Sequence, residues 1–394
     1  MIDVVIVGAC RTPIGSFGGS LSTLPATKLG AIVIEEALKR ARVGKEAVDE
    51  VNMGNVLTAG EGQAPARQAA LLAGLPPAVQ CMTVNKVCGS GMKAIMLGAQ
   101  AIQLGDADIV VAGGMESMSN APYLLEKARS GYKMGNGDLV DSMIKDGLWD
   151  VYNNFHMGNA AELCAQECAV PREAQDEFAI LSYKRAQESQ AAGRFKEEIV
   201  AIKIEHKKGD ERVIEEDEEP AKTNFAKISQ LKPAFQKDGT VTAANSSKIN
   251  DGAAAVVLMS SEKAKAIGAR PLAKIIASAS SAKKPEWFTT APADVIPKVL
   301  KKTGLSLTDI DLFEINEAFA VVTLAVNKLL GLDVKKVNVN GGAVALGHPI
   351  GASGARIVVT LMNALKQRNL TRGLAAICIG GGEASGIIIE AMNN

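Results

Sequence analysis

The chain has 394 residues; 47% of them are hydrophobic, 22% are charged, and Lys+Arg and Asp+Glu are both 43. This composition is typical of a folded protein with more than one core, and it excludes intrinsic disorder. The balanced charge gives no electrostatic basis for binding nucleic acid or a membrane surface, and no apolar run approaches the ~20 residues that a membrane-spanning helix needs.

The N-terminal end reads as structure rather than as a targeting segment. Residues 1–8 form an apolar run without a basic region, which predicts a short buried strand and no signal or transit peptide. The six cysteines are scattered and lack the spacing of a zinc site, so we expect free thiols in a reducing compartment. Together these features predict a cytoplasmic enzyme.

Two stretches of the chain repeat one another at an offset of 262 or 263 residues. Residues 48–54 match 310–316, and Ser90-Gly91 matches Ser353-Gly354. In each copy a helix is followed by an apolar strand, a loop, a Gly-Ser turn, a long helix, a strand and a glycine run. The duplication predicts two similar α/β halves, each a sheet covered by helices.

The closing strands of the copies, 107–114 and 374–381, are nearly continuous apolar runs, as expected of strands covered on both faces. Aligned by their glycine runs, they place Cys378 opposite Val111.

Between the copies, residues 119–249 differ in composition and indicate an insertion that covers a site. Within this stretch a helix is expected from Arg172 to about Ala192, after Pro171. The acidic run 215–219 is interpreted as a solvated loop.

Cys88 directly precedes a helix that is expected to begin near Ser90. Unpaired N–H groups and the positive end of the helix dipole would lower the pKa of this thiol from ~8.5 to near 7, which suits a nucleophile. The alternative is a small hydrophobic residue buried in a turn.

His348 lies in the turn Gly347-His348-Pro349-Ile350-Gly351, before the repeated helix. The pseudo-symmetry of the two copies places it close to Cys88, where a neutral imidazole could take the thiol proton. The alternative is a turn histidine without a chemical role.

Two further residues leave apolar strands of the second copy. Cys378 runs into Gly380-Gly381-Gly382, whose bare backbone could donate N–H groups to an oxyanion; alternatively, Cys378 is a core cysteine. Asn316 could hold a water or an oxyanion, or it could cap the helix that follows.

Four motifs together resemble those of the thiolase family, in particular its short-chain acetyl-CoA acetyltransferases. They are Asn85-Lys86-Val87-Cys88-Gly89-Ser90-Gly91, Asn316-Glu317-Ala318-Phe319, Gly347-His348-Pro349-Ile350-Gly351 and Cys378-Ile379-Gly380-Gly381-Gly382. The similarity begins at Arg11 and covers nearly the whole chain.

The resemblance implies reversible condensation of two acetyl-CoA molecules to acetoacetyl-CoA and CoA. Cys88 would carry the acetyl group, His348 would activate Cys88, and Cys378 would remove a proton from the second acetyl-CoA. Asn316 would hold a water that, with His348, stabilises the thioester oxygen of the second substrate. The N–H groups of Cys88 and Gly380 would form the oxyanion hole of the acyl-enzyme step.

The same resemblance implies a thiolase fold of two βαβαβαββ halves in a five-layer αβαβα core. Residues 1–118 with 250–270 would form the N-terminal half, 119–249 a loop domain that covers the active site and binds CoA, and 271–394 the C-terminal half. It also implies a homotetramer, a dimer of dimers. No cofactor is required beyond CoA, which is substrate and product.

A set of residues matches the family's CoA contacts: Leu148, His156, Met157, Lys222, Phe235, Ala243, Ser247, Ala318 and Phe319. Lys222 is the only cation near position 220, where related bacterial chains often carry an arginine. The run His156-Met157-Gly158 resembles short-chain members and argues against long acyl chains, and Phe288 resembles a subgroup that admits a 2-methyl branch.

The tail Gly382-Glu383-Ala384-Ser385-Gly386 resembles mitochondrial-type short-chain members, and this likeness implies a potassium ion. Its expected surroundings are Tyr152, Ala243, Ala244, Ser246 and Val344. Lys248 replaces the glycine that the family usually has after its Asn-Ala-Ser turn.

Two other activities are alternatives. A degradative thiolase of broader chain length would perform the same acyl transfer on longer substrates. A decarboxylating ketoacyl synthase would use two histidines beside its cysteine, and here Asn316 and Cys378 occupy those places, which argues against it.

Overall fold

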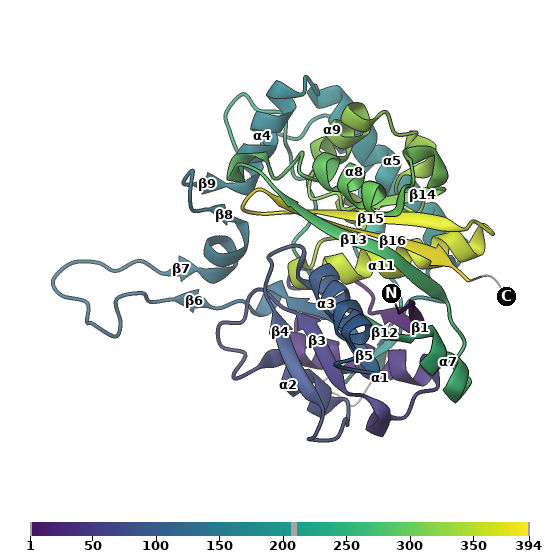
Figure 1. Ribbon diagram of the computed structural model, residues 1–394. Coiled ribbons are helices and arrows are strands. Elements are labelled where there is room, and N and C mark those ends of the chain that lie inside the picture. Colours follow the sequence, from purple (N-terminus) through teal and green to yellow (C-terminus); the bar gives the residue numbers. More distant parts are fainter. Residues whose placement is uncertain (1, 206–210, 393–394) are drawn as a thin grey trace.

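The computed structural model describes residues 2–205 and 211–392, and its two halves share one order of elements (Figure 1). The N-terminal half consists of β1 (Val4–Arg11), α1 (Ala26–Ala41), β3 (Glu50–Gly54), α2 (Pro65–Leu72), β4 (Gln80–Val84), α3 (Ser90–Leu104), β5 (Ile109–Ser117) and β12 (Asn250–Ser260). The C-terminal half consists of β13 (Ala273–Ala282), α8 (Pro292–Thr303), β14 (Leu312–Ile315), α9 (Ala320–Leu330), α10 (Ala343–Leu346), α11 (Ile350–Gln367), β15 (Arg372–Ile379) and β16 (Glu383–Ala391). The predicted duplication is confirmed.

The second half departs from the first at one sheet edge. Where the first half has β4 beside β3, the second has only a parallel bridge between Phe313 of β14 and Val337. The strands otherwise follow the order β14-β15-β16-β13-β1-β12-β5-β3-β4, and β1 joins the two sheets through a short pairing of Val4–Ile6 with β13.

The elements stack in the five layers that the resemblance implied. Helices α1 and α2 cover the outer face of the N-terminal sheet, and α8 covers the outer face of the C-terminal sheet, with α9 beside it (Figure 1). Helices α3 and α11 lie side by side between the two sheets. Strands β5 and β12 are buried almost throughout because helices cover both of their faces, which explains their continuous apolar sequence.

The segment between β5 and β12 lies largely outside this core. It contains β6 (Tyr123–Leu124), β7 (Val140–Asp141), β8 (Trp149–Asp150), β9 (Phe155–His156), α4 (Met157–Glu167), α5 (Arg172–Ala191), β10 (Ile202–Glu205), β11 (Glu211–Ile214) and α6 (Phe225–Ile228). Two further short elements are β2 (Gly15–Ser16) and α7 (Ser261–Ile267). The predicted helix from Arg172 is confirmed as α5.

The two central helices approach so closely at their N-terminal ends that side chains are excluded. A Cβ atom added to Gly91 of α3 would lie 2.9 Å from the backbone nitrogen of Ala355, and one added to Gly354 of α11 would lie 2.5 Å from the backbone nitrogen of Met92. Only glycine fits at these positions, and as a result the turns that precede α3 and α11 meet in the middle of the molecule.

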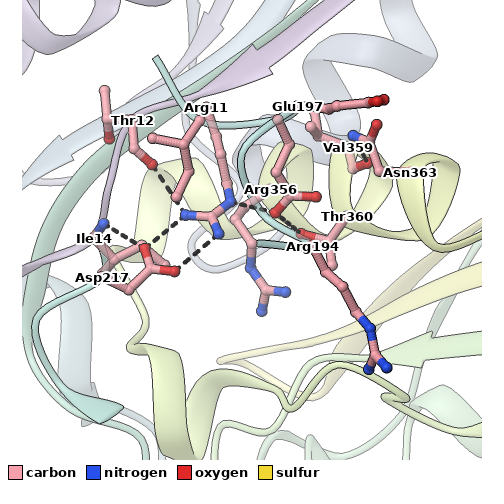
Figure 2. Close-up of polar contacts among 12 residues, drawn as sticks. Arg11, Thr12, Ile14, Arg194, Glu197, Asp217, Arg356, Val359, Thr360 and Asn363 are labelled. Carbon is pink, nitrogen blue, oxygen red and sulfur yellow. Dashed lines mark hydrogen bonds and ion pairs between the residues drawn. The ribbon is translucent and has the colours of Figure 1, made fainter. Parts of the chain in front are cut away.

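A buried ion network ties the insertion to the core. The Arg11 guanidinium on β1 is fully buried and binds Asp217 through two bonds, Nη1–Oδ1 of 2.6 Å and Nη2–Oδ2 of 2.9 Å (Figure 2). Arg11 Nε also donates to Glu198 at 2.6 Å, and Glu198 accepts the hydroxyl of Thr360 on α11 at 3.1 Å.

The expectation of a solvated acidic loop is therefore wrong for part of the run 215–219. Asp217 is buried on Arg11, and Glu218 accepts the N–H groups of Ser16 and Ser20. The buried arginine and the backbone N–H donors offset the free-energy cost of removing these carboxylates from water.

Replacing Asp217 by alanine is expected to lower the free energy of unfolding by about 3–5 kcal/mol, because it leaves the buried Arg11 charge without its bidentate partner. Urea unfolding measures this loss. The matched control is Asp108→Ala, which breaks an ion pair with Lys263 whose carboxylate side is 69% exposed and should cost less than about 1 kcal/mol. An equally small loss for Asp217→Ala would contradict the assignment.

Candidate active site

Cys88 lies between a strained turn and helix α3. Val87 has a φ of +45°, a left-handed conformation that is rare for a β-branched residue. The turn leaves Cys88 half-buried at the entrance to α3. The backbone N–H groups of Gly380 and of Cys88 itself lie close enough to the thiol to lower its pKa. The glycine run after β15, in the C-terminal half, thus lies beside Cys88, the predicted nucleophile of the N-terminal half.

The predicted low pKa of Cys88 is wrong for the free protein. Burial raises its pKa to about 11, the two N–H donors oppose this rise, and the nearby Glu116 carboxylate adds to it. Desolvation outweighs the helix terminus because Cys88 packs against a cluster that contains Val56, Leu57 and Ile350. Cys88 is therefore a thiol at neutral pH and needs a base at the moment of attack.

His348 is held as a neutral base by its neighbours. Its Nδ1 lies 2.6 Å from the Ser353 hydroxyl oxygen, and that hydroxyl donates to the carbonyl of Pro349 at 2.9 Å. Because the single hydroxyl proton is used there, Nδ1 carries the ring proton and Nε2 is the free acceptor. Burial lowers the pKa of His348 to about 3, and the Arg356 charge adds to this effect.

Asn316 follows β14 and is not the helix cap that was the alternative, because α9 begins at Ala320 with Phe319 as its N-cap. Its Nδ2 faces Nε2 of His348 at 3.4 Å, whereas its Oδ1 is buried without a hydrogen-bond partner. An unpaired buried oxygen is costly unless water fills the place, so the pair suits the water-holding role that the resemblance implied.

Cys378 ends β15 and is fully buried. Burial raises its pKa strongly, the nearby Cys88 raises it further, and the N–H groups of Cys378 and Ala318 lower it. The strand registers place Gly113 opposite Met53 and Ala376 opposite Ile315, so the counterpart of Cys378 in the first half is Met115. The sequence-based match to Val111 was wrong because the two glycine runs lie at different distances from the strand ends.

Two contacts hold the Cys88 turn against the glycine run after Cys378. The Lys86 ammonium pairs with the Glu383 carboxylate across the two turns. A Cβ atom at Gly89 would lie 2.3 Å from Ile379, so this glycine lets the Cys88 turn pack directly on the end of β15. The structure thereby brings Cys88, Gly380 and Cys378 into one site, with His348 and Asn316 joined to it through the turns that meet there.

Most of the predicted CoA contacts lie beside this site. Met157, Ala318 and Phe319 share an apolar cluster with Cys378, and Phe235 packs against it. The rings of His156 and Phe235 stack with centroids 4.8 Å apart, and Phe235 meets Phe319 edge to face at 6.1 Å.

Of the other predicted CoA contacts, Ser247 and Leu148 contact residues of the site, whereas Lys222 contacts none of the described ones. Ser247 donates its N–H to Ala318 O at 3.0 Å, Leu148 packs against the cluster that Cys88 joins, and Ala243 is exposed on the same loop as Ser247. Lys222 is exposed and its ammonium bonds to the Ser16 hydroxyl, so the contacts of the described residues do not connect it to the aromatic cluster.

The residues predicted around potassium do not all gather. Ala243, Ala244 and Ser246 lie on one loop, and Val344 shares an apolar cluster with Tyr183. Tyr152 instead lies at a turn between β8 and β9 with 74% of its surface exposed, and within residues 2–205 and 211–392 none of its contacts joins it to that loop. Tyr183, on α5, is the tyrosine beside it, as its contact with Lys248 shows.

One functional residue was missed by sequence reasoning. Glu116, at the end of β5, is fully buried and accepts four donors: Asn55 Nδ2 at 2.9 Å and the backbone N–H groups of Val56, Leu57 and Gly351 at 3.1, 3.2 and 2.8 Å. Burial raises the pKa of Glu116 to about 8, and the backbone N–H donors oppose this rise. The available signal was a single acidic residue at the exit of an otherwise apolar strand.

Alkylation of Cys88 by iodoacetamide, followed by the mass of its peptide, is expected to accelerate about tenfold for each pH unit up to about pH 10. The reason is that only the thiolate reacts and burial raises the pKa to about 11. In the denatured chain the same rate should level off near the ordinary thiol value of ~8.5. A plateau near pH 7 in the folded protein would contradict the account.

No helix within residues 2–205 and 211–392 is long and apolar enough to cross a membrane. In the same residues no group of three or more His, Cys, Asp and Glu side chains is arranged to hold a metal ion.

Comparison with known proteins agrees along the whole chain. The family models of the thiolase N-terminal domain and the thiolase C-terminal domain match residues 4–262 and 269–391. An acetyl-CoA acetyltransferase of Schizosaccharomyces pombe is 55% identical over 98% of both chains, and one of Cupriavidus necator is 55% identical over 99% of this chain and 100% of that one. A mitochondrial acetyl-CoA acetyltransferase of Rattus norvegicus is 56% identical over 99% of this chain and 91% of its own.

Solved structures agree as well. The crystal structure of an acetyl-CoA acetyltransferase from Bacillus anthracis matches with a TM-score of 0.97 and 45% sequence identity. The match covers 100% of this chain and 99% of the Bacillus anthracis chain. A thiolase of Ascaris suum, solved in complex with coenzyme A, has a TM-score of 0.94 and 48% identity over 99% of this chain and 100% of its own. With both family models matched in order and the duplicated fold confirmed, the chain belongs to the thiolase family.

Proposed function

We propose that this protein is an acetyl-CoA C-acetyltransferase, which condenses two molecules of acetyl-CoA to acetoacetyl-CoA and CoA and catalyses thiolysis in reverse. The observation that carries this proposal is the meeting of two thiols, Cys88 and Cys378, at one site with a neutral histidine and an unsatisfied amide. Full-length identity to acetyl-CoA acetyltransferases supports it.

In the first half-reaction Cys88 sulfur attacks the thioester carbonyl of acetyl-CoA. His348 Nε2 takes the thiol proton and returns it to the departing CoA sulfur, so one C–S bond forms as another breaks and CoA leaves as a thiol. The N–H groups of Cys88 and Gly380, which meet at the thiol in the free protein, stabilise the thioester oxygen as it becomes negative.

In the second half-reaction Cys378 first releases its thiol proton to solvent, and the resulting thiolate removes an α-proton from another acetyl-CoA. The resulting carbon attacks the acetyl group on Cys88, a C–C bond forms, and Cys88 leaves as a thiolate that regains a proton from Cys378. Asn316 and His348, through a water between them, stabilise the oxygen of the enolate. Cys378 then takes a proton back from solvent, so both thiols and His348 end the cycle as they began it.

The apolar cluster around Cys378, which would form the acyl pocket, supports short substrates. Gly158 leaves room for Phe235, since a Cβ atom at Gly158 would lie 2.2 Å from that ring, and Phe288, Phe319 and Met157 close the same cluster around Cys378. Residues 119–249 would act as the loop domain that binds CoA over two halves made of 1–118 with 250–270 and of 271–394. The pocket also motivates the proposal that Phe288 decides whether a 2-methyl branch is accepted.

The homotetramer is likewise a proposal, and two surfaces support it. Strand β4 lies at the edge of the sheet with Met82 43% exposed, and the β6–β7 hairpin projects far from the core (Figure 1). The hairpin carries exposed Leu125, Met134 and Leu139, which copies of the chain could bury. A cytoplasmic location stays a prediction, because the relatives include a mitochondrial enzyme.

Brief exposure to acetyl-CoA is expected to add one acetyl group to the Cys88 peptide, and added CoA is expected to remove it. Mass spectrometry of the intact protein and of its peptides checks both steps. A stable adduct on Cys378 instead, or none on a folded protein that binds CoA, would contradict the ping-pong route.

Cys378→Ser separates the half-reactions, because a serine hydroxyl cannot act as a base near neutral pH. Condensation and thiolysis are expected to fall by at least about 100-fold, the usual scale of a lost general base. Acetylation of Cys88 should change by no more than a few fold, measured by quenched-flow mass spectrometry. Equal losses in both steps would show that Cys378 also serves the first.

A further inference from the structure

One loop connects the predicted CoA contacts to both catalytic turns. Within residues 242–250, Ser247 donates its N–H to Ala318 O at 3.0 Å, and Asn245 O accepts the N–H of Ala320 at 2.8 Å. The N–H of His348 faces two acceptors on this loop, Lys248 O at 3.3 Å and Asn250 Oδ1 at 3.0 Å. The position of His348 therefore depends on the order of this loop.

The loop folds around an ammonium group of its own. Lys248 Nζ donates to Ala243 O at 2.6 Å and to Ser246 O at 3.0 Å. The same ammonium lies 5.5 Å from the centroid of the Tyr183 ring on α5. Two carbonyl oxygens and a tyrosine face thus bind a single positive charge.

These are the surroundings in which a potassium ion was expected, since Ala243 and Ser246 were among its predicted neighbours and Tyr183 takes the place that Tyr152 does not. Backbone carbonyl oxygens bind potassium by replacing its water shell, and they bind an ammonium group in the same way. A second cation would share these oxygens with Lys248 and meet its charge at close range. The residues present therefore do not fit a potassium ion.

We propose that the Lys248 ammonium is a built-in monovalent cation that orders the 243–248 loop, so that this thiolase needs no potassium for activity. A glycine at this position would have no group that could supply the charge. Lys248 is a positioning residue: it acts on His348 and Ser247 through the loop backbone and contacts no reacting atom. Only the activity measurement in the test depends on the proposed acyl transfer.

The test compares wild type, Lys248→Gly and Lys248→Met in potassium chloride and in sodium chloride of equal ionic strength. Lys248→Gly opens the carbonyl site, whereas Lys248→Met keeps the packing of the side chain and removes its charge. The control is Lys302→Ala, which deletes another ammonium-to-carbonyl bond, to Ser278 O at 2.8 Å, on the exposed surface. Thiolysis of acetoacetyl-CoA and the melting temperature are measured for each.

Wild type and Lys302→Ala are expected to show equal rates and equal melting temperatures in the two salts. Lys248→Gly should lose about tenfold in kcat in sodium chloride, a factor that corresponds to about 1.4 kcal/mol in the barrier, and potassium should restore most of it and raise the melting temperature. Lys248→Met should lose activity in both salts, because its side chain still fills the site.

Activation or thermal stabilisation of wild type by potassium over sodium would overturn the proposal. So would Lys248→Gly with full activity in sodium chloride, or a loss that potassium leaves unchanged. The melting temperatures report on the cation site even if wild type lacks thiolase activity, so failure of the proposed function would be seen separately.

Discussion

The close contact of helices α3 and α11 is the constraint on which the site depends. Because Gly91 and Gly354 bring backbone against backbone, the turns before the two helices meet between the sheets. The chain can then place Cys88 from one half beside Cys378 and the His348 turn from the other. A larger residue at this contact would separate the halves, so the glycines serve catalysis through packing.

Because of the duplication, helices α3 and α11 have similar N-terminal ends, but different groups lie at the two ends. At the N-terminal end of α11, the Glu116 carboxyl group accepts the N–H of Gly351. Gly351 corresponds to Cys88 in the repeat. At the N-terminal end of α3, the Gly380 N–H lies close enough to the Cys88 sulfur to lower its pKa. A carboxyl group of the protein thus occupies one helix end, and we propose that the other receives the oxygen of a thioester.

Sequence reasoning predicted the duplication, helix α5 and the turns that carry Cys88, His348, Asn316 and Cys378, because glycine, proline and apolar runs are local signals. It failed where the outcome depends on tertiary surroundings. The pKa of Cys88 rises because side chains distant in sequence enclose it. Asp217 is buried because Arg11 lies across from it, and Tyr183 rather than Tyr152 faces the loop at 243–248. The sequence shows the lysine at position 248, but it does not show that its ammonium group binds carbonyl oxygens of its own loop.

The most direct measurement of the central claim is a crystal structure of the acetyl-enzyme, trapped with acetyl-CoA in the Cys378→Ser variant. The account predicts an acetyl group on Cys88 whose carbonyl oxygen lies within hydrogen-bond distance of the backbone nitrogens of Cys88 and Gly380. An acetyl oxygen bound instead to His348 or to the Asn316 amide would contradict it, because the N-terminal end of α3 would then have no part in the chemistry.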